Sequence, residues 1–107
     1  MTRHITSAFS MKMVPFTECT ILVREVPLDE ATVWVRKAPF HSGVGHASTA
    51  VLMSSALGVD IPFNRADTKM EKGDELLIYQ YTGPRLEEGV TELPTGASAT
   101  WLRVDVL

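Results

Sequence analysis

Glu75-Leu76-Leu77-Ile78-Tyr79-Gln80-Tyr81 carries the strongest strand signal in this 107-residue chain. Four apolar residues stand together at its centre, a pattern typical of a strand that is buried within a sheet. Glu71-Lys72-Gly73-Asp74 precedes it as a turn signal, and Thr82-Gly83-Pro84 follows it. We therefore expect residues 75–81 to occupy a central position in a β-sheet.

Other segments of the chain predict further extended structure around this strand. Residues 59–65 are expected to form a short extended piece, and the turn at 71–74 is of the kind that joins antiparallel neighbours. The alternation of Thr100–Val106 predicts a strand at the edge of the sheet. The remaining expected strands are Arg3–Phe9, Cys19–Val26 and Asp67–Met70.

Two helices are predicted between the strands. The segment 28–37 has acids in its first turn and bases in its last, as the helix dipole favours, and Pro39 closes it. The second helix runs from about His46 to Leu57, with Gly58 at its stop. Interleaved helices and strands indicate one α/β domain over residues 1–107, with a mixed sheet and flanking helices. The predicted buried stripes are Leu28, Ala31, Val35 and Ala38 in the first helix, and Val51, Met53, Ala56 and Leu57 in the second.

Composition excludes several classes of protein. The chain is 45% hydrophobic and 21% charged, which is typical of a globular domain, and it has no apolar run long enough to span a bilayer. Its beginning lacks the apolar core of a signal peptide, so we expect a cytoplasmic protein. The single Cys19 has no partner for an internal disulfide. A net charge of −3 argues against a protein that coats DNA or another long nucleic acid, although it leaves a small anionic ligand open.

The stretch 42–49, Ser-Gly-Val-Gly-His-Ala-Ser-Thr, places His46 at the mouth of the second predicted helix. The first turn of a helix has unpaired backbone N–H groups and the positive end of the dipole, so a phosphate can bind there without a metal. A histidine beside that phosphate can move a proton. Taken alone, a histidine near a helix start is usually a cap or an ordinary surface residue.

Four pieces of the sequence together resemble a known family. They are Ala8-Phe9-Ser10, Gly45-His46-Ala47-Ser48-Thr49, Asn64-Arg65 followed by Met70-Glu71-Lys72-Gly73-Asp74, and Arg85-Leu86-Glu87-Glu88-Gly89. In this order and spacing the chain resembles the viral ring nucleases that act as anti-CRISPR proteins against type III systems, together with their viral and bacterial relatives. The similarity spans roughly Ile5 to Gly89.

The resemblance implies a homodimer that binds cyclic tetra-adenylate and cuts the ring to linear di-adenylate. It assigns His46 as the catalytic histidine and Glu88 as the acid that assists it, with Ser10 and Arg85 as ligand contacts. Gly45, Asn64 and Arg65 are further candidates for ligand binding. The family often has asparagine two places after the serine, where this chain has Lys12. A lysine can meet a phosphate but cannot accept a hydrogen bond, so the role of this position is open.

The chemistry agrees with such a substrate. The sequence shows no nucleophile motif and no metal-ligand spacing, and His4 and His41 lack carboxylates at a supporting distance, so no metal or cofactor is expected. An RNA ring supplies its own 2′-hydroxyl as nucleophile, which leaves His46 to protonate the departing 5′-oxygen. A helix N-terminus disfavours the charged imidazole that this step needs, and Glu88 would offset that effect. Arg85 would neutralise the phosphate.

Two other functions fit the same residues. In a protein that only sequesters a cyclic nucleotide, His46 would be a contact and not a proton donor. In a small structural or interaction domain, the 85–88 segment would be a solvated turn, and Ser10 a plain turn residue. Asn64 and Arg65 would then fix a loop or form a dimer contact.

Overall fold

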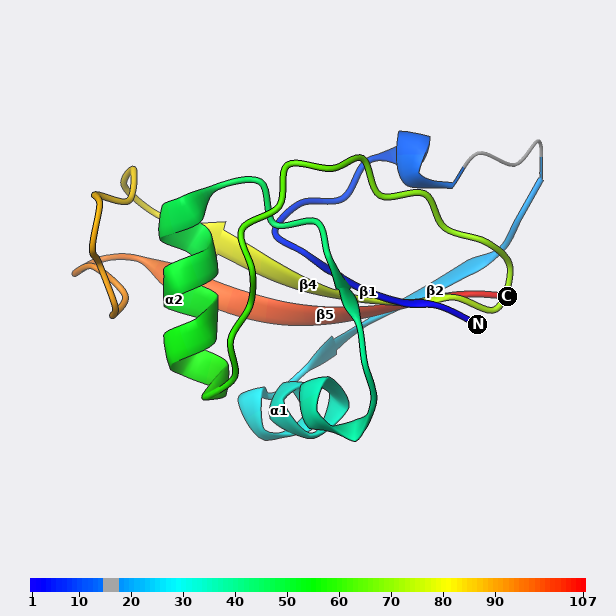
Figure 1. Ribbon diagram of the computed structural model, residues 1–107, viewed down its shortest axis with the longest axis horizontal. Coiled ribbons are helices and arrows are strands. Elements are labelled where there is room, and N and C mark those ends of the chain that lie inside the picture. The colour runs from blue at the N-terminus through cyan, green and yellow to red at the C-terminus, as the bar shows by residue number, and fades with distance from the viewer. Residues whose placement is uncertain (15–17) are drawn as a thin grey trace.

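A computed structural model describes residues 1–14 and 18–107 of the chain. It is a five-stranded mixed sheet with two α-helices, arranged as a small α/β domain (Figure 1), so the predicted fold class is confirmed. No helix in the described part of the chain has the length and apolar character needed to cross a membrane. In chain order the elements are β1 Arg3–Thr6, the 3-10 helix η1 Met11–Met13, β2 Ile21–Val26, α1 Leu28–Lys37, β3 His41–Ser42, α2 Ala47–Leu57, β4 Glu75–Thr82 and β5 Ser98–Val106.

The strand order is β2-β5-β4-β1-β3, so β4 is the central strand, as predicted. β1 runs parallel to β3 and β4, whereas β5 runs antiparallel to β4 and β2. Leu77 and Tyr79 of β4 belong to one buried cluster, and Leu76 and Ile78 belong to another on the opposite face. Burial on both faces explains why this segment is an unbroken apolar run.

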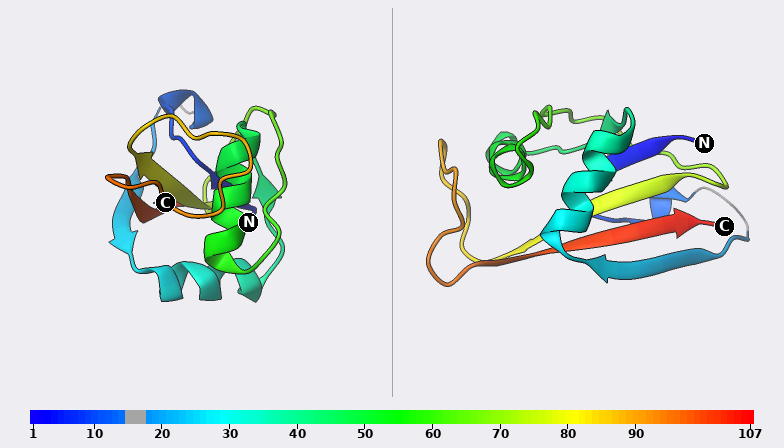
Figure 2. Two further views of the ribbon diagram at one scale, coloured as in Figure 1. Left: turned by 90° about the vertical axis from the view of Figure 1, so that its left-hand side faces the viewer. Right: turned by 90° about the horizontal axis from the view of Figure 1, so that it is seen from below.

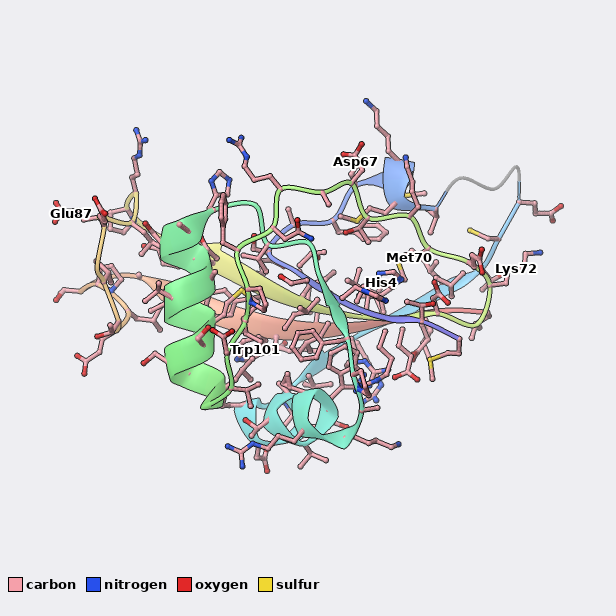
Figure 3. All side chains as sticks on the ribbon, in the orientation of Figure 1. His4, Asp67, Met70, Lys72, Glu87 and Trp101 are labelled. Carbon is pink, nitrogen blue, oxygen red and sulfur yellow. The ribbon has the colours of Figure 1, made fainter. Side chains whose placement is uncertain are left out.

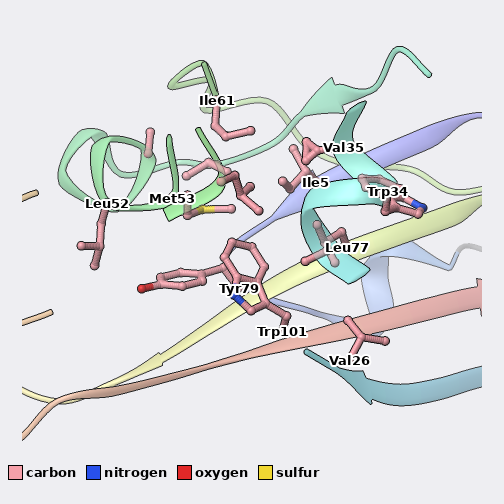
Figure 4. Packing of buried hydrophobic residues seen from close by; sticks show 14 residues of the cluster. Ile5, Val26, Trp34, Val35, Leu52, Met53, Ile61, Leu77, Tyr79 and Trp101 are labelled. Carbon is pink, nitrogen blue, oxygen red and sulfur yellow. The ribbon is translucent and has the colours of Figure 1, made fainter. Parts of the chain in front are cut away.

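Both α-helices cover the same face of the sheet. Figure 2 shows α1 lying across the strands and α2 standing at one end of them, and Figure 4 shows their side chains meeting those of β1, β4 and β5. Tyr79 of β4 and Trp101 of β5 lie on the sheet side of this core, with ring centroids 4.6 Å apart. Desolvation in this core, with the charge of Tyr81 nearby, raises the pKa of Tyr79.

Long segments without α-helices cover the other face of the sheet. Val14 and Met70 pack there against β4 and β5, and the backbone N–H of Met70 donates to the carbonyl oxygen of Met13 at 2.8 Å. The prediction of a strand at 67–70 is therefore wrong. The segment lies over the sheet and inserts Met70 into its core, and it has no strand partner among the described residues. The turn that follows it leads into β4 without joining two antiparallel strands.

The prediction that 100–106 is an edge strand is also wrong, because β5 is hydrogen-bonded to β2 on one side and β4 on the other. Its alternation of apolar and polar residues does not mark a solvent face. Arg103 is 9% exposed and donates to carboxylate oxygens of Glu75 and Asp105, each at 2.8 Å. Pairing allows these charges to be buried, so polar residues occupy an interior strand. The edge strands of the sheet are β2 and β3.

The first strand ends at Thr6 and not at Phe9, and the two-residue strand β3 was not predicted. In α1, Ala31 and Val35 are buried as expected, but Leu28 is exposed and Trp34 is buried in its place. The sequence pattern did not predict that Trp34 is buried, and its surroundings in the fold include polar groups. Its indole N–H donates to Glu75 at 2.8 Å, and the Arg3 guanidinium lies 3.9 Å from its ring centroid.

In α2, Met53 and Leu57 are buried as predicted, whereas Val51 and Ala56 are exposed. Ala50 and Leu52 are buried instead. Apolar residues occur all around this helix, so periodicity alone cannot select the face that packs on the sheet.

Candidate functional site

An open cleft of about 670 Å³ lies where three segments meet, which is within the range of about 300–1,000 Å³ for small-molecule sites. The start of α2 forms one wall, the segment 63–65 forms a second, and the end of β4 with the loop that follows it forms the third. This loop extends beyond the sheet beside α2 (Figure 1). The lining residues are Gly45, His46, Ala47, Ser48, Thr49, Phe63, Arg65, Tyr81, Gly83, Pro84, Arg85 and Leu86.

His46 is the N-cap of α2, so the helix begins one residue after it. Its carbonyl oxygen accepts a hydrogen bond from the backbone N–H of Ala50 at 3.0 Å, and its exposed side chain makes no capping hydrogen bond. The first-turn residues 47–49 line the cleft beside it. Their amides are those that an α-helix leaves unpaired, so this wall presents hydrogen-bond donors and the positive end of a dipole.

The loop before α2 is held by close packing. A Cβ at Gly43 would lie 2.4 Å from the hydroxyl oxygen of Thr68, so any larger residue there would force its neighbours to shift. The Ser42 hydroxyl donates to the carbonyl oxygen of Pro62 at 2.6 Å, and Val44 pairs with Phe63 in an isolated parallel bridge. These contacts fix the second wall against the first.

Two arginines line the cleft from different walls, Arg65 from the 63–65 segment and Arg85 from the loop after β4. None of the described residues that line the cleft carries a carboxylate. The cleft is therefore cationic although the whole chain carries a net charge of −3. Two guanidinium groups and a helix N-terminus together suit a ligand with more than one phosphate.

The loop that carries Arg85 is anchored at its base. The Tyr81 hydroxyl donates to the carbonyl oxygen of Pro84, and Gly83 packs so closely on Ala97 that a Cβ would lie 2.6 Å from its methyl carbon. The first contact fixes the turn just before Arg85, and the second joins the two ends of the 83–97 loop.

Four of the predicted site residues come together in this cleft: Gly45, His46, Arg65 and Arg85. Asn64 does not line it. Its side-chain amide donates to the carbonyl oxygen of Ser42 and its backbone N–H to that of Val44, both at 2.8 Å. Asn64 thus holds the wall in place and turns away from the cleft.

Ser10, Lys12 and Glu88 also lie outside the cleft lining. Ser10 caps η1 by accepting the Lys12 backbone N–H at 3.3 Å, and the Lys12 side chain is exposed. Glu88 is exposed on the loop after β4, next to Glu87, which Figure 3 places at the outer end of the molecule beyond α2. The expected proximity of Glu88 to His46 is not among the contacts of the described residues.

The sequence interpretation did not assign Phe63, Tyr81, Ser48 or Thr49 to the site. The serine and threonine lie two and three residues after His46, in the first turn of the helix, so the helix-start pattern itself was a signal for them. Phe63 gave only a weak signal, as an aromatic residue next to the Asn64-Arg65 pair.

Within residues 1–14 and 18–107, no three His, Cys, Asp or Glu side chains are grouped as metal ligands. His4 is buried and its Nε2 lies 3.1 Å from a carboxylate oxygen of Asp74. His41 has its ring centroid 6.2 Å from that of His4.

Comparison with known proteins agrees with the fold. The solved structure of B116 of Sulfolobus turreted icosahedral virus aligns with a TM-score of 0.83 at 25% identity, covering 98% of this chain and 99% of that one. "Uncharacterized protein 26" of Sulfolobus islandicus filamentous virus (isolate Iceland/Hveragerdi) is 33% identical over 86 residues, which are 80% of this chain and 72% of the relative. The profile of the STIV B116-like family matches residues 4–95, and the chain therefore belongs to this family of viral proteins.

Proposed function

We propose that the protein is a metal-independent ring nuclease that binds cyclic tetra-adenylate across a homodimer and cleaves it to linear di-adenylate ending in a 2′,3′-cyclic phosphate. In this role it switches off type III CRISPR signalling. The observation that supports the proposal is one cleft that combines His46, the amides at the start of α2, and the guanidinium groups of Arg65 and Arg85. A phosphodiester bound there has a proton donor and cationic groups beside it.

The reaction requires no nucleophile from the protein. The 2′-oxygen of one ribose attacks the adjacent phosphorus, its proton passes to water, and the bond from phosphorus to the 5′-oxygen breaks. His46 gives a proton to that 5′-oxygen as it leaves. Arg65 and Arg85 stabilise the charge that builds on the phosphate, and the amides of residues 47–49 hold the phosphate in line for attack.

Glu88 is assigned to stabilise the charged form of His46. It lies three residues beyond Arg85 on the same loop, so closure of this loop over a bound ring would carry both side chains toward the cleft. A Glu88→Gln variant should lose turnover while retaining binding. Glu87→Gln removes the same charge one residue away and serves as its matched control.

The dimer follows from the size and symmetry of the ring. A ring of four identical nucleotides has rotational symmetry, and a two-fold dimer presents the same groups to opposite phosphates. One cleft per chain then accounts for two cuts in each ring. Gel filtration with light scattering tests this part, and a protein that remains monomeric with the ring bound contradicts it.

The deciding assay mixes the protein with labelled cyclic tetra-adenylate in a chelator and separates the products. We expect linear di-adenylate from the parent and retention of the intact ring by His46→Ala. The rate of cleavage should fall by roughly 100-fold or more, the range for loss of a general acid. His41→Ala, which removes an exposed histidine of β3, should cleave as fast as the parent.

A sequestering protein is the second candidate, and the position of Glu88 outside the cleft lining favours it. That function predicts tight retention of the uncut ring by the parent and a loss of affinity, not of turnover, in His46→Ala.

A further inference from the structure

Phe63 is a large apolar side chain at the cleft that the proposed chemistry does not use. It is 51% exposed, although it lies between residues that are held firmly. Exposed aromatic surface at a polar cleft contributes little to folding, because its burial is incomplete. An exposed aromatic ring at a cleft can pack or stack against a bound ligand.

The backbone around Phe63 is fixed on both sides. The Pro62 carbonyl oxygen accepts the Ser42 hydroxyl at 2.6 Å, and Phe63 itself bridges to Val44. Asn64 is held through its backbone and its side chain, at 2.8 Å in each case. The ring is therefore displayed from a preorganised segment, so little ordering of the backbone opposes binding.

The direction of the side chains places the ring beside a cation. In extended backbone, residues i and i+2 point to the same side. Phe63 and Arg65 accordingly both line the cleft, whereas Asn64 between them turns to Ser42. This segment thus offers an aromatic face and a guanidinium group to one ligand, next to the start of α2.

A ligand that uses both groups needs a flat apolar part and an anionic part joined by a short linker. A nucleotide has this composition, since its base presents a π-face and its phosphate lies one ribose away. Stacking of bases on aromatic side chains contributes about 1–3 kcal/mol per base in proteins that bind single strands. It tolerates any base, because every base has a π-face.

From this arrangement we infer that Phe63 is the platform on which a nucleobase of the bound ring stacks, while the phosphate of the same unit lies between Arg65 and the start of α2. The inference rests on the proposed function and adds a role for the base. Phe63 contributes affinity for the ring and does not select adenine over another purine.

The test uses the full chain and two forms of the ring. One is cyclic tetra-adenylate, for kcat and KM, and the other is a 2′-O-methylated ring with one 2-aminopurine, which cannot be cut and whose emission falls on stacking. Phe63→Leu keeps apolar volume and removes the π-face. It should raise KM and weaken binding of the methylated ring by roughly 30-fold or more, the range that corresponds to loss of two stacked bases, one for each chain of the dimer, with kcat nearly unchanged. The quenching of 2-aminopurine should disappear.

Two controls make the result specific. Phe63→Tyr keeps the ring and should bind and quench within about threefold of the parent, whose stacking it preserves. Val33→Ala removes an exposed apolar side chain of α1 outside the cleft and should leave binding unchanged.

The outcomes separate this inference from the proposed function. A parent that cuts the ring, together with Phe63→Leu of unchanged KM and quenching, overturns the stacking role alone. So does a Phe63→Leu protein that loses its dimer while its monomer binds as well as the parent, because Phe63 is then an interface residue. A parent that neither binds nor cuts the ring overturns both.

Discussion

The Tyr81 hydroxyl donates a hydrogen bond to the carbonyl oxygen of Pro84, across the turn that leads from β4 to Arg85. The phenol is half-buried against the helix-covered core, and the turn it holds is exposed. Through this bond the sheet sets where the loop begins, and with it the position of the guanidinium group in the cleft.

Tyr81→Phe should weaken ring cleavage without unfolding the protein. It keeps the aromatic ring in the core and removes one hydrogen bond, worth about 1 kcal/mol. We expect the free energy of unfolding to fall by about 1 kcal/mol, and kcat/KM to fall because the turn no longer holds Arg85 at the cleft.

A double-mutant cycle with Arg85→Ala tests whether the effect of Tyr81→Phe acts through Arg85. If Tyr81 acts by positioning Arg85, the tyrosine substitution has no further effect once the guanidinium is absent. Additive losses in the double variant would contradict the positioning role and assign Tyr81 a contact of its own.

Arg65→Gln should weaken binding of the ring and its dependence on salt. A charge-assisted hydrogen bond is worth about 1.5–3 kcal/mol, and the dimer loses one from each chain, so we expect binding to be weaker by roughly 150-fold or more at low ionic strength. The slope of log K against log salt should become shallower by about 0.7 for each phosphate that the variant no longer neutralises. Arg36→Gln makes the same charge change on α1, away from the cleft, and an equal effect there would show that only net charge matters.

The sequence predicted those parts of the fold that a single local signal determines. The apolar run 76–79 indicated the central strand because both of its faces are buried, and the glycine after Leu57 marked the end of α2. β5 was misplaced because its polar residues are buried through pairing with Glu75, a partner 28 residues away from Arg103. Alternation cannot distinguish such a strand from one with a solvent face.

The sequence predicted those parts of the candidate site whose geometry is determined by local structure alone. The predicted helix start was enough to locate His46 and the backbone amides of the first turn of α2. Arg65 and Arg85, in contrast, reach the cleft only through the packing of two segments that are distant in sequence. Asn64 adjoins Arg65 in sequence but points the other way, which a motif cannot reveal. The role of Phe63 depends on its exposure, and exposure is a property of the folded chain.

Asp74 should make stability depend on acid pH. Its buried carboxylate accepts backbone N–H groups of Thr2 and Glu71 at 2.8 and 2.9 Å, and lies 3.1 Å from His4. Desolvation acts to raise its pKa, but these hydrogen bonds and the histidine outweigh it, so the pKa of Asp74 is lowered from its ordinary value of 3.8. Asp74→Asn should cost about 2–4 kcal/mol of unfolding free energy near neutral pH.

The sign of the pH effect follows from the lowered pKa. The stabilisation from Asp74 is fully present above the unfolded pKa of about 3.9 and is lost as the pH falls through the lower folded value. Urea unfolding of the parent and Asp74→Asn from pH 7 downward should therefore converge only below about pH 4. A difference in stability that stays constant to the lowest pH would rule out the charge as its source.

Gly43 and Gly45 flank Val44 in the loop that leads to His46, yet they should respond differently to alanine. A Cβ at Gly43 meets the Thr68 hydroxyl at 2.4 Å and the Thr6 methyl at 3.3 Å, whereas at Gly45 it meets only the Arg65 side chain, at 3.9 Å. Gly43→Ala should lower stability by about 1–3 kcal/mol through overpacking.

Gly45→Ala, in contrast, should change the unfolding free energy by no more than about 0.5 kcal/mol. Thermal unfolding of the two variants measures this contrast, with Tm lower by about 4–8 °C for each kcal/mol of destabilisation. The methyl group of the alanine would lie in the cleft itself, so we expect it to affect ring binding and not folding. Equal melting temperatures for the two variants would mean that the 66–68 segment yields to a side chain at Gly43. It would then not be the rigid support that fixes the loop before His46.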